Sequence, residues 1–370
     1  MENAVQEMDV MKQIYPDFYP EFRCLAGKCP DTCCKDWEVV VDPETMEFYR
    51  SVPGELGERL KNGFVEQDGD ICFRLENGKC TFLTEDGLCE LQKTFGEKGL
   101  CRICASHPRF LEEYGATQEI TLSISCPEAA RLLLCRQEPI RFLTRETDEA
   151  VDTPNALDPE LYFTLRSVRE TVLRLVQDRS HPIRDRLSLA LLLCQKVQKR
   201  IDMRSLAAVS KLCAQFSARS EQERLLLRLR RCRRRSADFF PAWLLLRNME
   251  HLTAEFPALL ERRAYERRPE NAFFERFSVQ LENLAVYFFF RYLLKASVDG
   301  ALIEKAGACV FHVLAISRLA ASMQIEALPE LCSLCGLYSK EVEHSEENLQ
   351  LLYRTIRHGA LRVGTLLAMI

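Results

Sequence analysis

Cysteine is the residue whose placement in this sequence points most directly to chemistry. Eleven of the seventeen cysteines fall within the first 135 residues, and nine of those eleven are closely spaced. Thiolates are soft ligands that favour zinc or iron–sulfur clusters over hard cations, and short-spaced pairs on loops can converge on one metal. The candidate ligands are Cys24, Cys29, Cys33 and Cys34 in a first group, Cys80, Cys89, Cys101 and Cys104 in a second, and Cys126 after them.

Two other roles for these cysteines compete with metal binding. Free cysteine often packs as a small hydrophobic residue, and disulfides form mainly in oxidising compartments. The N-terminus carries Glu2, Glu7 and Asp9 and has no apolar core of the kind that a secretory signal needs. We therefore expect a soluble cytoplasmic protein whose clustered thiols bind metal.

Nine thiolates are more than one simple site requires, so either two sites exist or some cysteines support the ligands indirectly. The spacing matches neither a two-cysteine, two-histidine zinc finger nor the run of four cysteines in bacterial ferredoxins. The metal can thus be an iron–sulfur cluster or zinc. His107 follows Cys104 by three residues and is either a mixed ligand or a packing histidine.

Loops, turns and short strands are expected to carry the cysteines. Asn77-Gly78 lies between the apolar segments 71–75 and 80–83, which is a strong signal for a hairpin because both turn residues tolerate positive φ. Alternating apolar residues predict a strand over 119–125. Pro127 predicts the start of a helix with Cys126 at its N-terminus.

Beyond about residue 158 the sequence changes to long segments with helical periodicity. The fold class we expect is mainly α, with a small, loop-rich cysteine-cluster domain with short strands over 1–135 packed on a helical body over 136–370. The expected helices lie near 158–177, 184–200, 205–217, 220–235, 240–262, 271–297, 301–323 and 345–368.

Bulk composition narrows the possible partners. The formal net charge of −4 gives no basis for binding nucleic acid. The most apolar stretch, 284–294, contains Arg291 and is shorter than the roughly 20 residues of a membrane-spanning helix. Glycine-rich dinucleotide and phosphate-binding motifs are absent from the sequence, as are the H-E-x-x-H and G-x-S-x-G motifs.

A second group of polar residues falls on one predicted helix. Asn283, Tyr287 and Arg291 are four residues apart and therefore share one helix face. That face can present an amide, a phenol and a guanidinium to a carboxylate or a lysine. The alternative is a polar stripe on a helix that otherwise packs into the core.

Several segments together resemble the flagellin lysine N-methyltransferases of bacteria, and the cysteine groups resemble a zinc- or iron-chelating cysteine-cluster domain. One departure follows Cys104, where the family tends to show arginine and then an aromatic residue before Pro-Arg, and this chain has Ala105, Ser106 and His107. The matching segments are FRCLAGKCPDTCC at 22–34, CTFLTEDGLCEL at 80–91, GLCRICASHPR at 99–109, LSISCPEAARL at 122–132 and ENLAVYFFFRY at 282–292.

The resemblance implies methyl transfer from S-adenosylmethionine to lysine ε-amines of flagellin, with an iron–sulfur cluster involved. It further implies that Arg109 contributes to cofactor binding and that Asn283, Tyr287 and Arg291 are catalytic. Two rival functions stay open. One is a non-catalytic interaction or chaperone module with structural zinc or an iron–sulfur site, and the other is a redox protein.

Overall fold

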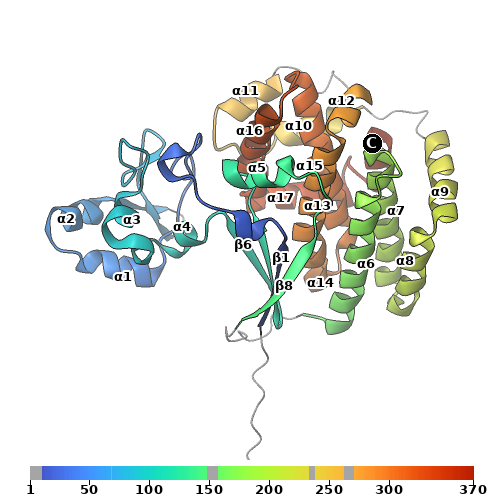
Figure 1. The fold of residues 1–370 in the computed structure, drawn as a ribbon, viewed down its shortest axis with the longest axis horizontal. Coiled ribbons are helices and arrows are strands. Elements are labelled where there is room, and N and C mark those ends of the chain that lie inside the picture. Colours follow the sequence, from blue (N-terminus) through green and yellow to red (C-terminus); the bar gives the residue numbers. More distant parts are fainter. Residues whose placement is uncertain (1–10, 68, 148–156, 233–237, 262–270) are drawn as a thin grey trace, which may run out of the picture.

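A helical body, a four-stranded sheet and a small cysteine-rich module make up the structure, which is a computed structural model (Figure 1). It describes residues 11–67, 69–147, 157–232, 238–261 and 271–370. The module lies on one side of the sheet and the long helices lie on the other. The predicted fold class, mainly α with a small strand-containing N-terminal part, is confirmed.

The central sheet has the strand order β6-β7-β1-β8. Strand β1 runs parallel to β7 and antiparallel to β8, and β6 is antiparallel to β7. The strand predicted over 119–125 is β7, and its residues 118–122 are all buried. The bounds are β1 Met11–Pro16, β6 Arg109–Tyr114, β7 Thr117–Leu122 and β8 Phe142–Thr147.

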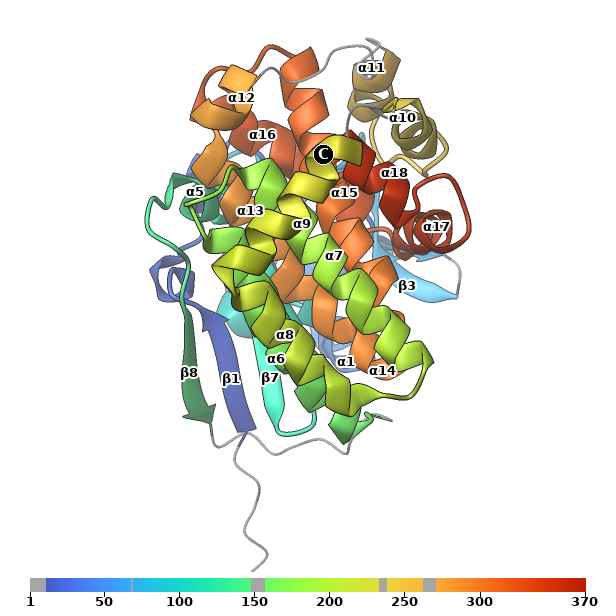
Figure 2. The same cartoon turned by 90° about the vertical axis from the view of Figure 1, so that its right-hand side faces the viewer.

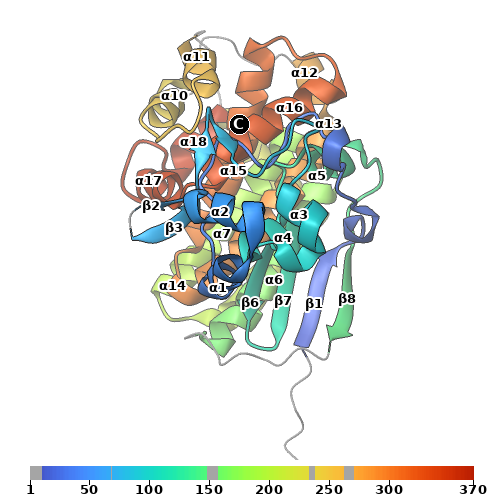
Figure 3. The same cartoon turned by 90° about the vertical axis from the view of Figure 1, so that its left-hand side faces the viewer.

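The cysteine-rich module is the stretch of chain between β1 and β6, and Figure 3 looks onto it. It has its own hydrophobic cluster, in which Tyr49, Phe73 and Phe82 are buried. Its elements are α1 Pro43–Ser51, α2 Gly54–Asn62, β2 Phe64–Gln67, β3 Asp70–Phe73, β4 Leu75–Glu76, β5 Lys79–Cys80, α3 Glu90–Phe95 and α4 Arg102–Ser106.

The predicted turn at Asn77-Gly78 is confirmed, with φ of 50° and 77° at the two residues. It joins only the short strands β4 and β5. The segment expected to continue that hairpin, β3, pairs instead with β2. The pairing places the ring of Phe73 5.4 Å from that of Phe64, so aromatic packing in the module core selects the different partner.

The helical body begins at α5, whose predicted start at Pro127 is confirmed. Two helices, α13 and α15, form its centre, and residues 280–292 of α13 are all buried. Helices α8 and α9 lie outside α6 and α7 (Figure 2). The bounds are α5 Pro127–Cys135, α6 Pro159–Gln177, α7 Ile183–Asp202, α8 Val209–Ser217, α9 Arg219–Cys232, α10 Phe240–Arg247, α11 Glu255–Glu261, α12 Asn271–Arg276, α13 Ser278–Tyr292, α14 Ala296–Asp299, α15 Leu302–Ser322, α16 Leu328–Tyr338, α17 Glu346–Arg357 and α18 Val363–Met369.

Three of the expected helices are wrong as continuous elements. The segment 240–262 forms α10 and α11, 271–297 forms α12 to α14, and 345–368 forms α17 and α18. The loop between α10 and α11 is held by the buried carboxylate of Glu341, which accepts hydrogen bonds from the backbone N–H groups of Leu252 and Thr253. A tertiary contact of this kind leaves no trace in local periodicity.

Helix α16 was not expected from the sequence. Its Pro329 occupies the first turn, where the missing N–H costs nothing. The helix leads directly into a π-helical turn, Ser339–Glu343. Of the helices expected over 220–235 and 240–262, positions 233–235 and 262 lie outside the described residues.

Buried hydrophobic residues form two clusters, a small one within the module and a large one that includes β7, α5 and the long helices. The division of domains at residue 135 stays a prediction. Among the described residues, no helix combines the length and apolar character needed to cross a membrane.

Candidate metal centre

A pocket of about 640 Å³ lies where the cysteine-rich module meets the helical body. Its lining comes from the loop 22–39 and later parts of the module, from the start of α5, and from residues of the body that include Lys340 and His344. The structure brings eight of the nine predicted ligands to this pocket, and Cys101 is fully buried behind it. The eight are Cys24, Cys29, Cys33, Cys34, Cys80, Cys89, Cys104 and Cys126.

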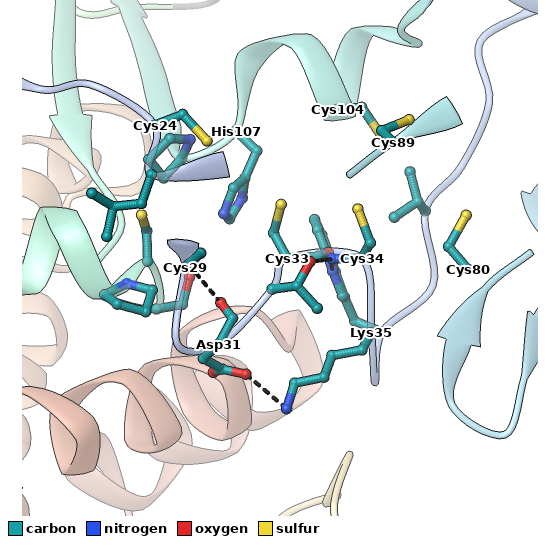
Figure 4. A pocket seen from close by; sticks show the side chains of 18 of the residues that line it. Cys24, Cys29, Asp31, Cys33, Cys34, Lys35, Cys80, Cys89, Cys104 and His107 are labelled. Carbon is teal, nitrogen blue, oxygen red and sulfur yellow. Dashed lines mark hydrogen bonds and ion pairs between the residues drawn. The ribbon is translucent and has the colours of Figure 1, made fainter. Parts of the chain in front are cut away.

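The thiols gather in a different way from their order in the chain. Cys33 and Cys34 are adjacent in the chain, but their thiols belong to two different sets. Figure 4 shows Cys24 and Cys29 on one side of them and Cys89 and Cys104 on the other. The electrostatic neighbours of each thiol give one set of Cys24, Cys29, Cys33 and Cys126, and another of Cys34, Cys80, Cys89, Cys101 and Cys104.

Local backbone contacts explain why the loop carries Cys34 to the second set. The backbone N–H of Cys80 donates to the carbonyl of Cys34 over 2.9 Å, which joins the loop to the β4–β5 hairpin. Gly27 makes a second close approach, because a Cβ there would lie 2.9 Å from the carbonyl oxygen of Asp86. A glycine is therefore required where the loop crosses the turn before Cys89.

The donor set fits a soft metal in its chemistry. Within the described part of the chain, no three Cys, His, Asp or Glu side chains form a ready-made metal site. Burial raises the pKa of Cys29, Cys89 and Cys126, and raises that of Cys80 to about 12. Such thiols ionise when a metal takes the place of the proton. An iron–sulfur cluster or zinc at this pocket stays a prediction.

Aromatic and imidazole rings line part of the same pocket. The ring of Trp37 lies 5.6 Å from that of His107 and 5.7 Å from that of His344. His344 Nε2 is 3.0 Å from the hydroxyl oxygens of Ser123 and Ser125. Burial lowers the pKa of His107 to about 4 and that of His344 to about 3, so both imidazoles are neutral at pH 7.

Sequence reasoning missed Trp37 and His344 as pocket residues. His344 follows a π-helical turn more than two hundred residues after the serines that it contacts, and no spacing rule connects them. The one available signal was Trp37 itself, an uncommon residue three positions after Cys34.

Arg109, the predicted cofactor-binding residue, lies in the pocket lining. Its Nε donates to the hydroxyl of Tyr19 over 3.0 Å, and its guanidinium carbon lies 5.5 Å from the ring centroid of Phe22. These contacts orient the guanidinium and leave its other N–H groups able to bind an anion. Its predicted role in cofactor binding stays a prediction.

Asn283, Tyr287 and Arg291 share a face of α13, as the spacing predicted, but they do not line the pocket. The amide of Asn283 donates to the carbonyls of Leu133 and Arg136, both over 2.9 Å. Tyr287 donates to the carboxylate of Glu343, and Arg291 lies 3.6 Å from the same carboxylate. Their catalytic role stays a prediction, and the contacts that the structure shows are structural.

We expect Asn283→Ala to lower the free energy of unfolding by about 1–3 kcal/mol, because a buried and a half-buried carbonyl at the end of α5 would lose their donor. Urea denaturation followed by circular dichroism measures this change. Asn62→Ala, at an exposed amide, is the matched control and should have little effect. A loss of activity with unchanged stability would instead support a catalytic role for Asn283.

The π-helical turn connects the pocket to the body. Lys340 Nζ lies 2.5 Å from the carboxylate of Asp31, which sits in the loop between Cys29 and Cys33. Four positions along, His344 reaches the ring of Phe110, which also stacks under the guanidinium of Arg291 at 3.2 Å. One short element therefore touches both the cysteine loop and the buried network of α13.

We expect Lys340→Met to weaken metal binding by about tenfold, because Asp31 loses one of its two cations and the loop that presents Cys29 and Cys33 is held less firmly. Competition with a chelator, followed by metal analysis, measures the effect. Lys61→Met removes a comparable but exposed ion pair and serves as the control. Equal metal retention in both variants would contradict this role for Lys340.

Comparison with known proteins gives a matching family model and several similar proteins. A family model described as the FliB lysine N-methylase C-terminal domain matches residues 169–370. The flagellar biosynthetic protein FliU of Salmonella muenchen is 31% identical over 131 residues, which cover 32% of this chain and 75% of that protein. No solved structure matches the chain.

Two further relatives carry the name lysine-N-methylase, one from Salmonella typhimurium and one from Salmonella choleraesuis. Each is 31% identical over 126 residues, covering 32% of this chain. The matched stretch spans 31% of the length of each of those two proteins.

Proposed function

The chain belongs to the FliB lysine N-methylase family, and on that premise we propose that it transfers methyl groups from S-adenosylmethionine to lysine ε-amines of flagellin in the cytoplasm. We further propose that its pocket cysteines hold an iron–sulfur cluster, with zinc as the alternative. The observation that carries the proposal is that one pocket unites these cysteines with Lys340 and His344, which lie in the family-matched segment.

The residues that would hold the metal come from the two thiol sets around Cys33 and Cys34. When bound, a cluster with an open coordination position would supply a Lewis-acidic site for the aminocarboxylate of S-adenosylmethionine. Arg109 lies in the same pocket and offers guanidinium N–H groups to the carboxylate.

The pocket also suits the amine. A lysine attacks only as the neutral amine, and burial lowers a lysine pKa because it penalises the ammonium form. Trp37, His107 and His344 line part of the pocket with their rings, which offer an apolar surface to the side chain of the lysine. The pocket must then hold the amine in line with the sulfonium methyl, and such positioning can contribute a large part of the rate enhancement.

The test combines metal analysis with an activity assay. The protein is purified without oxygen, its iron, sulfide and zinc are measured, and its absorption spectrum is recorded. It is then incubated with flagellin and S-adenosylmethionine, and methylation is read by mass spectrometry. We expect a brown protein that methylates lysine.

Two outcomes would change the proposal. A colourless zinc protein that methylates would remove the iron–sulfur cluster and keep the methyl transfer. A folded, metal-loaded protein that transfers no methyl group would favour a non-catalytic module whose metal only stabilises the fold.

A further inference from the structure

The rings of Trp37, His107 and His344 form a continuous wall, which we call the ring wall. Two of its members are held in place by hydrogen bonds. Trp37 Nε1 donates to the carbonyl of Cys33 over 2.6 Å, and His344 is held by Ser123 and Ser125. The ring wall is therefore built in advance of any ligand, which reduces the entropic cost of binding.

The geometry of the ring wall limits what it can accept. The plane of Trp37 is inclined by 47° to that of His107 and by 64° to that of His344. Flat bases bind best where two faces are parallel, whereas inclined rings present faces and edges to a slender chain. Rings in this arrangement attract an alkylammonium group through the negative potential of their faces and pack against its methylenes.

The lysines that line the pocket are paired within the chain and supply no amine to the ring wall. The carboxylate of Asp31 is paired with Lys35 and Lys340, and that of Glu128 with Arg131. Both lysines in the lining are thus engaged in ion pairs, and neither is positioned as a free amine of the chain. An amine that meets the ring wall must come from another molecule or segment.

We propose that Trp37, His107 and His344 form the subsite that receives the side chain of the substrate lysine. This inference rests on the proposed function and adds the place where the lysine binds. Trp37 contributes its face to the ammonium and methylenes, and the two imidazoles in contact with its ring extend the subsite. It lies where the module, through Trp37 and His107, meets the body, through His344, and it does not include Asn283, Tyr287 or Arg291.

The experiment compares variants of Trp37 with a variant of the second tryptophan in the chain, Trp243 of α10, which lies outside the pocket. Trp37→Ala, Trp37→Phe and Trp243→Phe are purified with their metal. Binding of a fluorescein-labelled flagellin peptide containing one lysine is measured by anisotropy, alongside the same peptide with norleucine in place of lysine. Methylation assays give KM separately for the peptide and for S-adenosylmethionine.

We expect Trp37→Ala to raise both Kd and KM for the lysine peptide about tenfold, with a smaller increase in Trp37→Phe, which keeps a ring. The KM for S-adenosylmethionine and the metal content should stay unchanged, and Trp243→Phe should match the wild type. The norleucine peptide should bind weakly to every variant.

Three results would overturn the inference. A rise in KM for S-adenosylmethionine alone would assign the ring wall to the cofactor. A loss of metal in both Trp37 variants would mean that Trp37 acts only through Cys33. Equal binding of the lysine and norleucine peptides would show that the amine is not recognised.

If the wild type methylates nothing but binds lysine peptide in a Trp37-dependent manner, the proposed function fails and the subsite stands.

Discussion

Replacing Cys104 with serine is expected to reduce the bound metal at least about tenfold and to abolish methyl transfer. The thiol of Cys104 lies near that of Cys101, and Cys34 and Cys89 are also among its thiol neighbours. A serine hydroxyl is a hard, weakly acidic group and cannot replace a thiolate on zinc or iron. Metal analysis and the absorption spectrum after anaerobic purification measure the loss.

Cys135→Ser is the matched control, because Cys135 is exposed and does not line the pocket. It should keep the metal and the activity of the wild type. The helical circular dichroism of Cys104→Ser should also be retained, since Cys104 packs on the small module core and not on the large cluster of the body. Full metal occupancy in Cys104→Ser would contradict the assignment of this thiol set.

The largest loss of stability is expected from Glu119→Ala. Glu119 of β7 and Arg169 of α6 form a buried, two-bond ion pair, with side-chain exposures of 4% and 6%. Arg169 also donates to the carbonyl of Phe290 and stacks on its ring. Removing the carboxylate leaves a guanidinium buried without its counter-charge, which costs about 3–5 kcal/mol.

Urea denaturation measures the unfolding free energy of this variant against Glu112→Ala. Glu112 lies directly opposite Glu119 in the sheet and pairs with Lys295, but that pair is about one third exposed. Its loss should cost under about 1 kcal/mol because solvent already screens it. If Glu119→Ala and Glu112→Ala lost the same unfolding free energy, the buried Glu119–Arg169 pair would not be what anchors the sheet.

The composition of the pocket was predictable, but the grouping of its thiols was not. Nine cysteines stood out by their number and spacing, and eight of them reach one pocket. Cys33 and Cys34 are adjacent in the chain, so spacing assigns them to one group. In the structure they fall in two groups, because the N–H of Cys80 binds the carbonyl of Cys34 and draws its thiol toward the second group. That contact depends on a hairpin more than forty residues later in the chain.

The face of α13 shows a similar limit. Periodicity correctly placed Asn283, Tyr287 and Arg291 on one side of a helix, because the 3.6-residue repeat is local. What that side contacts is set by the C-terminal end of α5 and by Glu343, and neither is close in sequence. Likewise, the break between α10 and α11 depends on Glu341, which lies about ninety residues later in the sequence.

The parallel pairing of β1 with β7 has a consequence for how the chain can be divided. Parallel neighbours require a long connection, and here residues 17–108 and the β6 strand supply it. The segment 17–108 leaves the sheet at the end of β1 and returns to it at the start of β6. These two points lie about two strand spacings, or roughly 10 Å, apart, because only β7 separates the two strands. A chain in which a short glycine–serine bridge replaced this segment could still close the sheet, and closure entropy changes only slowly with the length removed. The helices behind the sheet would keep their core except for the contacts of Phe18, Tyr19 and Phe22, which belong to the large cluster or pack against it.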